Sequence, residues 1–178
     1  MKLRQIVGLI QASLCAVLAS CAATAPAPAP EPLRVPETQR LIAQLHATGV
    51  QIYQCQPRKN DPALFEWSFK QPEATLFTKA GKSMAKHYAG PTWEADDGSK
   101  VIGEVVARSD SPKPDSIPWL LLRAKTTSGS GLFSGVLSIQ RLDTVGGSAP
   151  AKGCLQPQSG QVLRVSYTAN YLFYGMKP

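Results

Sequence analysis

The sequence predicts a mainly β protein, either an antiparallel β-sandwich or a barrel-like domain with one short N-terminal helix. Short segments rich in β-branched and aromatic residues recur along residues 50–174, and Gly, Pro and Asp turns separate them. Apolar and polar residues alternate along residues 64–70. Because successive side chains of a strand point to opposite faces, this alternation indicates a sheet with one buried face. Many short strands at near-regular spacing are typical of sandwiches and barrels.

Residues 37–47 predict the helix. Leu41, Ile42 and Leu45 fall at helical spacing, Thr38 precedes them as a candidate N-cap, and Gly49 follows as a stop signal. The turn Asp96-Asp97-Gly98 favours a tight hairpin, because glycine adopts positive φ freely. The expected strands are residues 50–56, 64–70, 74–79, 92–95, 100–108, 118–126, 133–142 and 161–174.

The first 20 residues have the layout of a secretory signal peptide: a basic start, an apolar run and small residues at the end. The tetrad Leu-Ala-Ser-Cys that ends at Cys21 resembles the lipobox of bacterial lipoproteins. That resemblance implies cleavage before Cys21 and a lipid on its thiol, so the first expected partner is a membrane. The alternative is an ordinary signal peptide that is cleaved near Ala22.

The expected organisation is a signal peptide over 1–20, a lipidated cysteine and Pro/Ala-rich linker over 21–36, and one β-rich domain over 37–178. Alternating Ala and Pro in the linker favour an extended spacer without side chains for a core. Ala22 stands where an Asp retains many lipoproteins in the inner membrane. The resemblance therefore implies a lipid-anchored envelope protein in the outer membrane that faces the periplasm.

The positive charge of the chain is modest and dispersed. The formal charge is +7, and loss of Lys2 and Arg4 with the leader lowers it to about +5. The chain has no run of five basic residues and no basic amphipathic helix, so nucleic-acid binding is not expected. A small molecule or a cell-wall polymer remains a candidate ligand.

Two cysteines remain for the domain itself, Cys55 and Cys154. In an oxidising compartment they are expected to form a disulfide. The alternative is a metal site, but His46 and His87 are the only histidines and the chain has no Cys-x-x-Cys pair. No metal is therefore expected.

Five segments resemble the domain of unknown function 3455 family, which implies an exported protein of bacterial or fungal type without an assigned activity. The segments are GVQIYQC (49–55), HYAGPTWEADDGSKVIGE (87–104), IPWLLLRA (117–124), FSGVLSIQRLDTVGGSAPAKGC (133–154) and VSYTANYLFY (165–174). The chain has no strand–GxGxxG–helix unit, so neither a nicotinamide nor any other cofactor is expected.

The candidate catalytic residues are His87, Glu94 and Asp96, because a histidine beside a carboxylate can transfer protons near neutral pH. In the alternative interpretation His87 is a surface or loop residue and the aspartate belongs to a turn. Trp93 and Trp119 are candidate ligand-binding residues that could form an apolar pocket. More often, tryptophans in such a chain are core residues.

Two functions are consistent with these patterns. The first is an exported, lipid-anchored envelope protein that acts as a non-catalytic binding or structural module. The second is an enzyme that acts on an envelope or extracellular small molecule, with His87 as the general base. The absence of any complete catalytic motif in the sequence favours the first.

Overall fold

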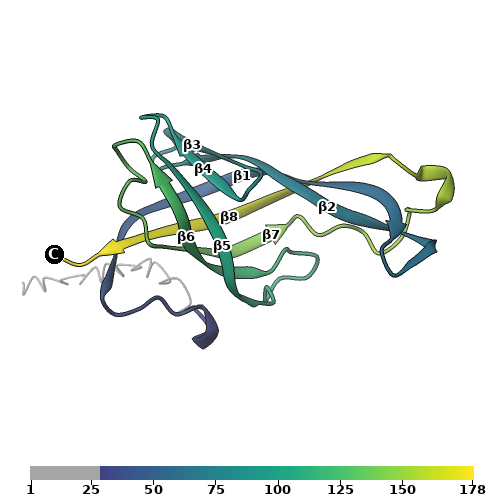
Figure 1. The fold of residues 1–178 in the computed structure, drawn as a ribbon, viewed down its shortest axis with the longest axis horizontal. Helices are drawn as coiled ribbons and strands as arrows, with labels where there is room; N and C mark the ends of the chain where they lie inside the picture. The colour runs from purple at the N-terminus through teal and green to yellow at the C-terminus, as the bar shows by residue number, and fades with distance from the viewer. Residues whose placement is uncertain (1–28) are drawn as a thin grey trace, which may run out of the picture.

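The computed structural model describes residues 29–178, which form one antiparallel sheet that closes into a ring (Figure 1). Each strand pairs with the next, and the last pairs with the first. The mainly β prediction is therefore confirmed. The strands are β1 (Gln39–Arg58), β2 (Asp61–Phe77), β3 (Ser83–Tyr88), β4 (Thr92–Ala95), β5 (Lys100–Ser109), β6 (Trp119–Ser128), β7 (Ser138–Gly146) and β8 (Val162–Met176).

The helix predicted over residues 37–47 is wrong, because this segment forms the first half of β1. Within residues 29–178 the only helices are two 3-10 turns, η1 (Glu31–Leu33) and η2 (Gln156–Gln158). Leu41 is 46% exposed, so the apolar spacing that suggested a helix does not mark one buried stripe. Instead Leu45 and Ala47 alternate into the core, and β8 pairs along this half of the strand. Pairing with a distant strand thus overrides a weak local helix preference.

Three strands are longer than the others, with 20 residues in β1, 17 in β2 and 15 in β8, and they divide the fold into two regions. β1 and β2 pair from His46 to Arg58. Of β2, only the last residues, Ala74 to Phe77, pair with β3. The arm, which we define as residues 50–73 with residues 147–166, projects from the ring (Figure 1). The remaining strand residues form the ring itself. β2 merges the two strands expected over 64–70 and 74–79.

The core occupies the inside of the ring. Along β8, Tyr167, Ala169, Tyr171 and Phe173 are at most 2% exposed, and the residues between them are more exposed. This alternation of period two is the one expected of a strand with one buried face. Complete burial of such an aromatic side chain contributes roughly 1.5–3 kcal/mol.

A second, smaller apolar cluster lies on the outer face of the sheet. Leu33 of η1 is fully buried against Trp119 of β6 and Leu142 of β7. The Gln140 side-chain amide donates to the Leu33 carbonyl oxygen over 2.6 Å. Residues 29–36 were expected to be part of the spacer, so this end of the predicted linker packs against the domain.

The predicted disulfide between Cys55 and Cys154 is present, and it joins two residues 99 positions apart. It attaches the loop before β8 to the β1 half of the arm. The predicted signal peptide and Cys21 lie outside the described residues. Over residues 29–178, no helix is long and apolar enough to cross a membrane.

Candidate functional site in the ring interior

A pocket of about 450 Å³ opens where the arm leaves the ring. Its volume lies within the range of roughly 300–1,000 Å³ that small-molecule sites occupy. β1, β2, β3, β4, β5, β6, β7 and β8 all contribute to its wall, so closure of the ring creates it. The polar and aromatic residues of its lining include Gln51, Tyr53, His87, Trp93, Arg141 and Tyr171.

His87 lies inside the ring on β3 and is 3% exposed, which corrects the interpretation of a surface or loop residue. Its Nδ1 lies 2.8 Å from the Thr92 carbonyl oxygen. Because a carbonyl can only accept, Nδ1 carries the proton and the neutral ring keeps Nε2 unprotonated. Burial lowers the pKa of His87 to about 3, despite the opposing effect of this hydrogen bond. His87 is therefore a neutral part of the pocket wall at physiological pH.

Trp93 forms the aromatic wall next to His87. The two rings stack with centroids 4.4 Å apart and an interplanar angle of 9°, and Tyr171 meets the indole edge-on at 5.4 Å. Gly103 on β5 leaves room for the indole, since a Cβ there would lie 2.9 Å from a ring carbon of Trp93. The indole is thus held on several sides, and it serves both as core and as pocket wall.

The two candidate acids do not join His87. His87 of β3 is paired with Trp93 of β4, and both side chains point to the ring interior. Glu94 is the next residue, so its side chain points to the opposite face of the sheet. There its carboxylate accepts from the Tyr88 hydroxyl over 2.6 Å and lies 3.2 Å from Lys100 Nζ. The Tyr88 hydrogen bond, followed by Lys100, lowers the pKa of Glu94.

Asp96 is exposed in the turn between β4 and β5, as the turn interpretation expected. Its neighbour Asp97 makes the contacts of this turn. One Asp97 carboxylate oxygen accepts from the Ser99 backbone and hydroxyl, and the other accepts from the Leu132 amide over 2.8 Å. These bonds, chiefly those from Ser99, lower the pKa of Asp97. The acidic stretch therefore fastens a turn to the loop that precedes β7.

Trp119 does not reach the pocket with Trp93. It lies on the outer face of β6, where it packs against Leu33. Its neighbours Pro118 and Leu120 line the pocket instead. Of the two tryptophans expected to form a ligand site, the structure therefore places only Trp93 in it.

Sequence reasoning missed the two polar residues deepest in the site, Gln51 and Arg141. Both side chains point inward from their strands and line the pocket. For Arg141 the alternation is clear, because Ile139, two residues earlier, belongs to the core. Arg141 is half-buried, and its Nε and Nη2 both donate to the Pro118 carbonyl oxygen, over 3.1 and 2.9 Å. The available signal was a polar residue at an inward position of a predicted strand, which is rare without a function or a partner.

The start of the loop after β7 packs against two residues of the pocket wall, Tyr53 and Gln51. The Tyr53 hydroxyl donates to the Gly147 carbonyl oxygen over 2.7 Å. Gly147 has a φ of +87°, and a Cβ there would lie 2.9 Å from Tyr167 and 3.1 Å from Gln51. Any other residue would thus be strained and would push against the pocket wall.

The residues that match a known family are nearly the same residues that form the ring and the arm. Residues 36–175 match the family described as a protein of unknown function (DUF3455). The chain belongs to this family. The match begins just before β1 and ends one residue before the end of β8, so it includes every residue that lines the pocket. No curated protein and no solved structure matches the chain.

No metal centre is assembled by the part of the chain that the structure describes. Over residues 29–178, no three His, Cys, Asp or Glu side chains come together in a way that could hold an ion. The chemistry that the pocket offers is instead hydrogen bonding, one half-buried cation and aromatic contact.

Proposed function

We propose that this chain is an exported, lipid-anchored protein of the bacterial cell envelope whose β domain binds a small molecule without catalysis. In this proposal the ring is a barrel-like container, and the pocket beside Trp93 is the binding site. The single observation that carries the proposal is this pocket of about 450 Å³, enclosed by strands from the whole ring. The anchor rests on the lipobox-like tetrad that ends at Cys21, and the outer-membrane location rests on Ala22 in the place where an Asp retains many lipoproteins in the inner membrane.

The size of the pocket favours a small molecule over a long polymer. A volume of about 450 Å³ suits a ligand of drug-like size or one terminal unit of a larger chain. Its walls are mostly apolar, with a few polar groups such as Gln51 and Arg141. Binding sites for small molecules commonly combine an apolar wall with a few polar groups that fix orientation.

The enzyme alternative has less support. His87 does line the pocket, but its lowered pKa makes it a weak base at neutral pH. Its hydrogen-bond partner is a backbone carbonyl, and Glu94 lies on the other face of the sheet. A general base needs a pKa nearer to the working pH and, in a catalytic pair, a group that orients it.

A matched pair of variants tests whether the pocket binds small molecules. Val105 and Val106 are 49% and 50% exposed, but only Val105 lines the pocket. We expect Val105→Trp to obstruct the mouth and to weaken binding of the neutral fluorophore N-phenyl-1-naphthylamine by about tenfold or more. Val106→Trp should leave its affinity within about twofold.

The readout is fluorescence titration of the purified full-length chain, with circular dichroism to check folding. Equal affinities for wild type, Val105→Trp and Val106→Trp would place the fluorophore elsewhere on the surface and contradict the proposal. Absence of binding to the wild type would contradict it as well.

A separate measurement tests the anchor. Mass spectrometry of the chain recovered from bacterial membranes should find an N-terminus at Cys21 that carries a lipid. Fractionation should place this form in the outer membrane. An unmodified start at Ala22 or later, or an intact leader in cytosolic protein, would contradict the anchored location.

A further inference from the structure

We propose that the ligand of this pocket is an organic anion, with an apolar body and an acidic head group such as a carboxylate that Arg141 binds. This inference rests on the proposed binding function and specifies the chemical class of the ligand. It follows from the charge of the wall, the unpaired donors within it and the placement of one aspartate.

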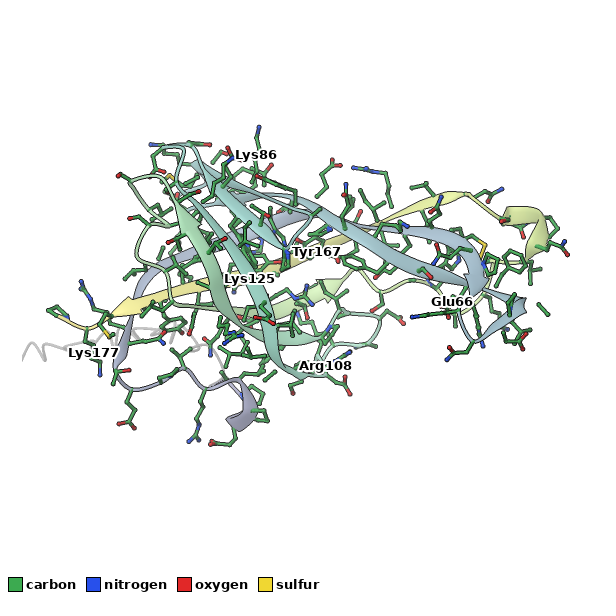
Figure 2. All side chains as sticks on the ribbon, in the orientation of Figure 1. Glu66, Lys86, Arg108, Lys125, Tyr167 and Lys177 are labelled. Carbon is green, nitrogen blue, oxygen red and sulfur yellow. A yellow bond between two sulfur atoms is a disulfide. The ribbon has the colours of Figure 1, made fainter. Side chains whose placement is uncertain are left out.

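The wall of the pocket is positively charged. Its lining includes the cations Lys70, Arg108 and Arg141, and among the described residues that line it none is Asp or Glu. Lys70 and Arg108 are exposed, and Arg141 lies deeper. Figure 2 shows Arg108 at one end of the ring and Tyr167 inside it, with Glu66 far away on the arm. Three cations in a wall whose described residues include no carboxylate attract anions.

Arg141 has no charged partner within residues 29–178. None of the ion pairs formed there includes Arg141, although Arg123 and Arg164 each pair with a glutamate. The titratable groups that its charge influences are Tyr53, His87, Tyr167 and Tyr171. Burial keeps all four neutral at physiological pH, because it raises the pKa of each tyrosine and lowers that of the histidine.

A half-buried cation without an anion is unfavourable, since it has lost water and gained only neutral partners. A guanidinium has five N–H donors. In Arg141 the two donor atoms Nε and Nη2 share one acceptor, the Pro118 carbonyl, and the guanidinium also contacts the neutral Tyr171 hydroxyl. The guanidinium therefore retains donors for a carboxylate, which is the acceptor that best matches its planar geometry.

Two further buried donors in the wall lack a close acceptor. The indole nitrogen of Trp93 is inaccessible to solvent and has no hydrogen-bond acceptor among residues 29–178. The side-chain nitrogen of Gln51 also lacks a close acceptor there, although burial raises the pKa of Tyr167 and a longer contact from the Gln51 amide opposes that rise. Gln51 is 2% exposed and Trp93 is 1% exposed. Buried polar groups are nearly always paired, so these two nitrogens are polar positions behind the wall that a ligand acceptor reaches only after a side-chain rotation. A ligand with acidic oxygens supplies acceptors of this kind.

The backbone of β7 keeps a carboxylate out of the pocket. Ile139 and Arg141 face inward, so strict alternation would direct Asp143 inward as well. Instead the pairing of β7 and β8 shifts between Leu142 and Val145, and Asp143 adopts a φ of +52°. Its carboxylate accepts from the Asn170 amide over 2.9 Å, away from Arg141. An uncommon backbone conformation thus leaves the guanidinium free for an external anion.

The rest of the wall fits the apolar body of the ligand. Aliphatic and aromatic side chains form most of it, and Phe69 at the mouth is 53% exposed. They include Phe69, Trp93, Val105, Ile117, Leu120 and Leu122. A small inorganic anion would leave this surface unused, so the geometry favours an amphipathic organic anion.

Two fluorophores with the same scaffold test the charge requirement. One is 8-anilinonaphthalene-1-sulfonate, and the other, N-phenyl-1-naphthylamine, lacks the sulfonate. For the full-length chain we expect the sulfonate to bind at least about tenfold more tightly. Arg141→Met should remove this advantage and leave the affinity of the neutral fluorophore within about twofold. Decanoate should displace the sulfonate, and decan-1-ol should do so much less well.

Arg123→Met is the matched control, because Arg123 is an exposed cation on β6 outside the pocket. It should change neither affinity. The inference is overturned if both fluorophores bind equally, or if Arg141→Met and Arg123→Met have the same effect. The proposed function would still stand in that case, provided that Val105→Trp blocks the neutral fluorophore. If Val105→Trp blocks neither, the binding function itself is contradicted.

A second variant keeps the inference testable if Arg141→Met does not fold. Gln51→Met removes one unpaired donor and preserves the side-chain length. It should lower the ratio of sulfonate affinity to neutral-fluorophore affinity severalfold, with folding confirmed by circular dichroism. An unchanged ratio in a folded Gln51→Met protein would contradict the placement of the acidic group beside Gln51.

Discussion

The two ends of the ring interior use opposite chemistry on the same strands. At the packed end, defined by Leu45, Val101, Phe133, Ile139 and Phe173, every side chain is at most 4% exposed and apolar. At the pocket end, which comprises Gln51, Tyr53, His87, Trp93, Arg141 and Tyr171, polar and charged atoms face a cavity. β8 contributes Phe173 to one end and Tyr171 to the other. The packed end stabilises the fold. The polar groups of the pocket end lower the stability of the folded state, as is common at binding sites.

The largest expected effect comes from the packed end. Phe173→Ala removes a fully buried ring that lies 4.6 Å from Phe133 and 6.1 Å from Trp93, measured between centroids. We expect the free energy of unfolding in urea to fall by about 3–5 kcal/mol. A loss below about 1 kcal/mol would mean that this end is not the main source of stability.

Lowering the pH should reduce the free energy of unfolding through His87, a residue of the pocket end. The pKa of His87 is about 3 in the folded chain, below its ordinary value of 6.5. The unfolded chain therefore takes up a proton that the folded chain excludes, and stability falls as the pH drops below about 6.5. Between pH 6.5 and 5, where carboxylates remain ionised, the loss should be roughly 2 kcal/mol.

The two histidines of the chain allow a direct control for this prediction. Urea unfolding at several pH values should show the acid loss in wild type and in His46→Gln, because His46 is exposed. His87→Gln should remove most of it. If His46→Gln and His87→Gln behave alike over this range, the assignment to His87 is wrong.

The smallest expected effect is a gain. Within residues 29–178 the buried side-chain nitrogen of Gln51 has no close acceptor and only a longer contact with the Tyr167 hydroxyl, so the folded state bears part of the cost of desolvating the amide. Gln51→Met should leave stability unchanged or raise it by up to about 1 kcal/mol in the same urea measurement. A clear loss of stability would show that the Gln51 amide has a structural partner, and it would weaken the contrast between the two ends.

The strand-rich character of the fold was predictable from the sequence, because most strands carry β-branched or aromatic residues between turn signals. β3 escaped prediction, since Ala85 and His87 are its inward residues and neither is a strong strand former. The first half of β1 was mistaken for a helix because its pairing partner, β8, is distant in sequence. Local patterns do not record such pairing.

The candidate site was only partly predictable. His87 and Trp93 stand out as rare residue types, and both line the pocket. Gln51 and Arg141 belong to segments with ordinary strand composition, so their meaning depends on the inward direction that ring closure gives them. Trp119 and Glu94 lie near the site in sequence, but strand alternation turns both to the outer face.

A crystal structure of the chain with bound 8-anilinonaphthalene-1-sulfonate would test the central claim most directly. The sulfonate oxygens should lie within hydrogen-bonding distance of the Arg141 guanidinium. The naphthalene should lie against the apolar wall that includes Trp93 and Leu120. A fluorophore bound on the outer face, or one whose sulfonate points to solvent while Arg141 keeps only the Pro118 carbonyl, would contradict it.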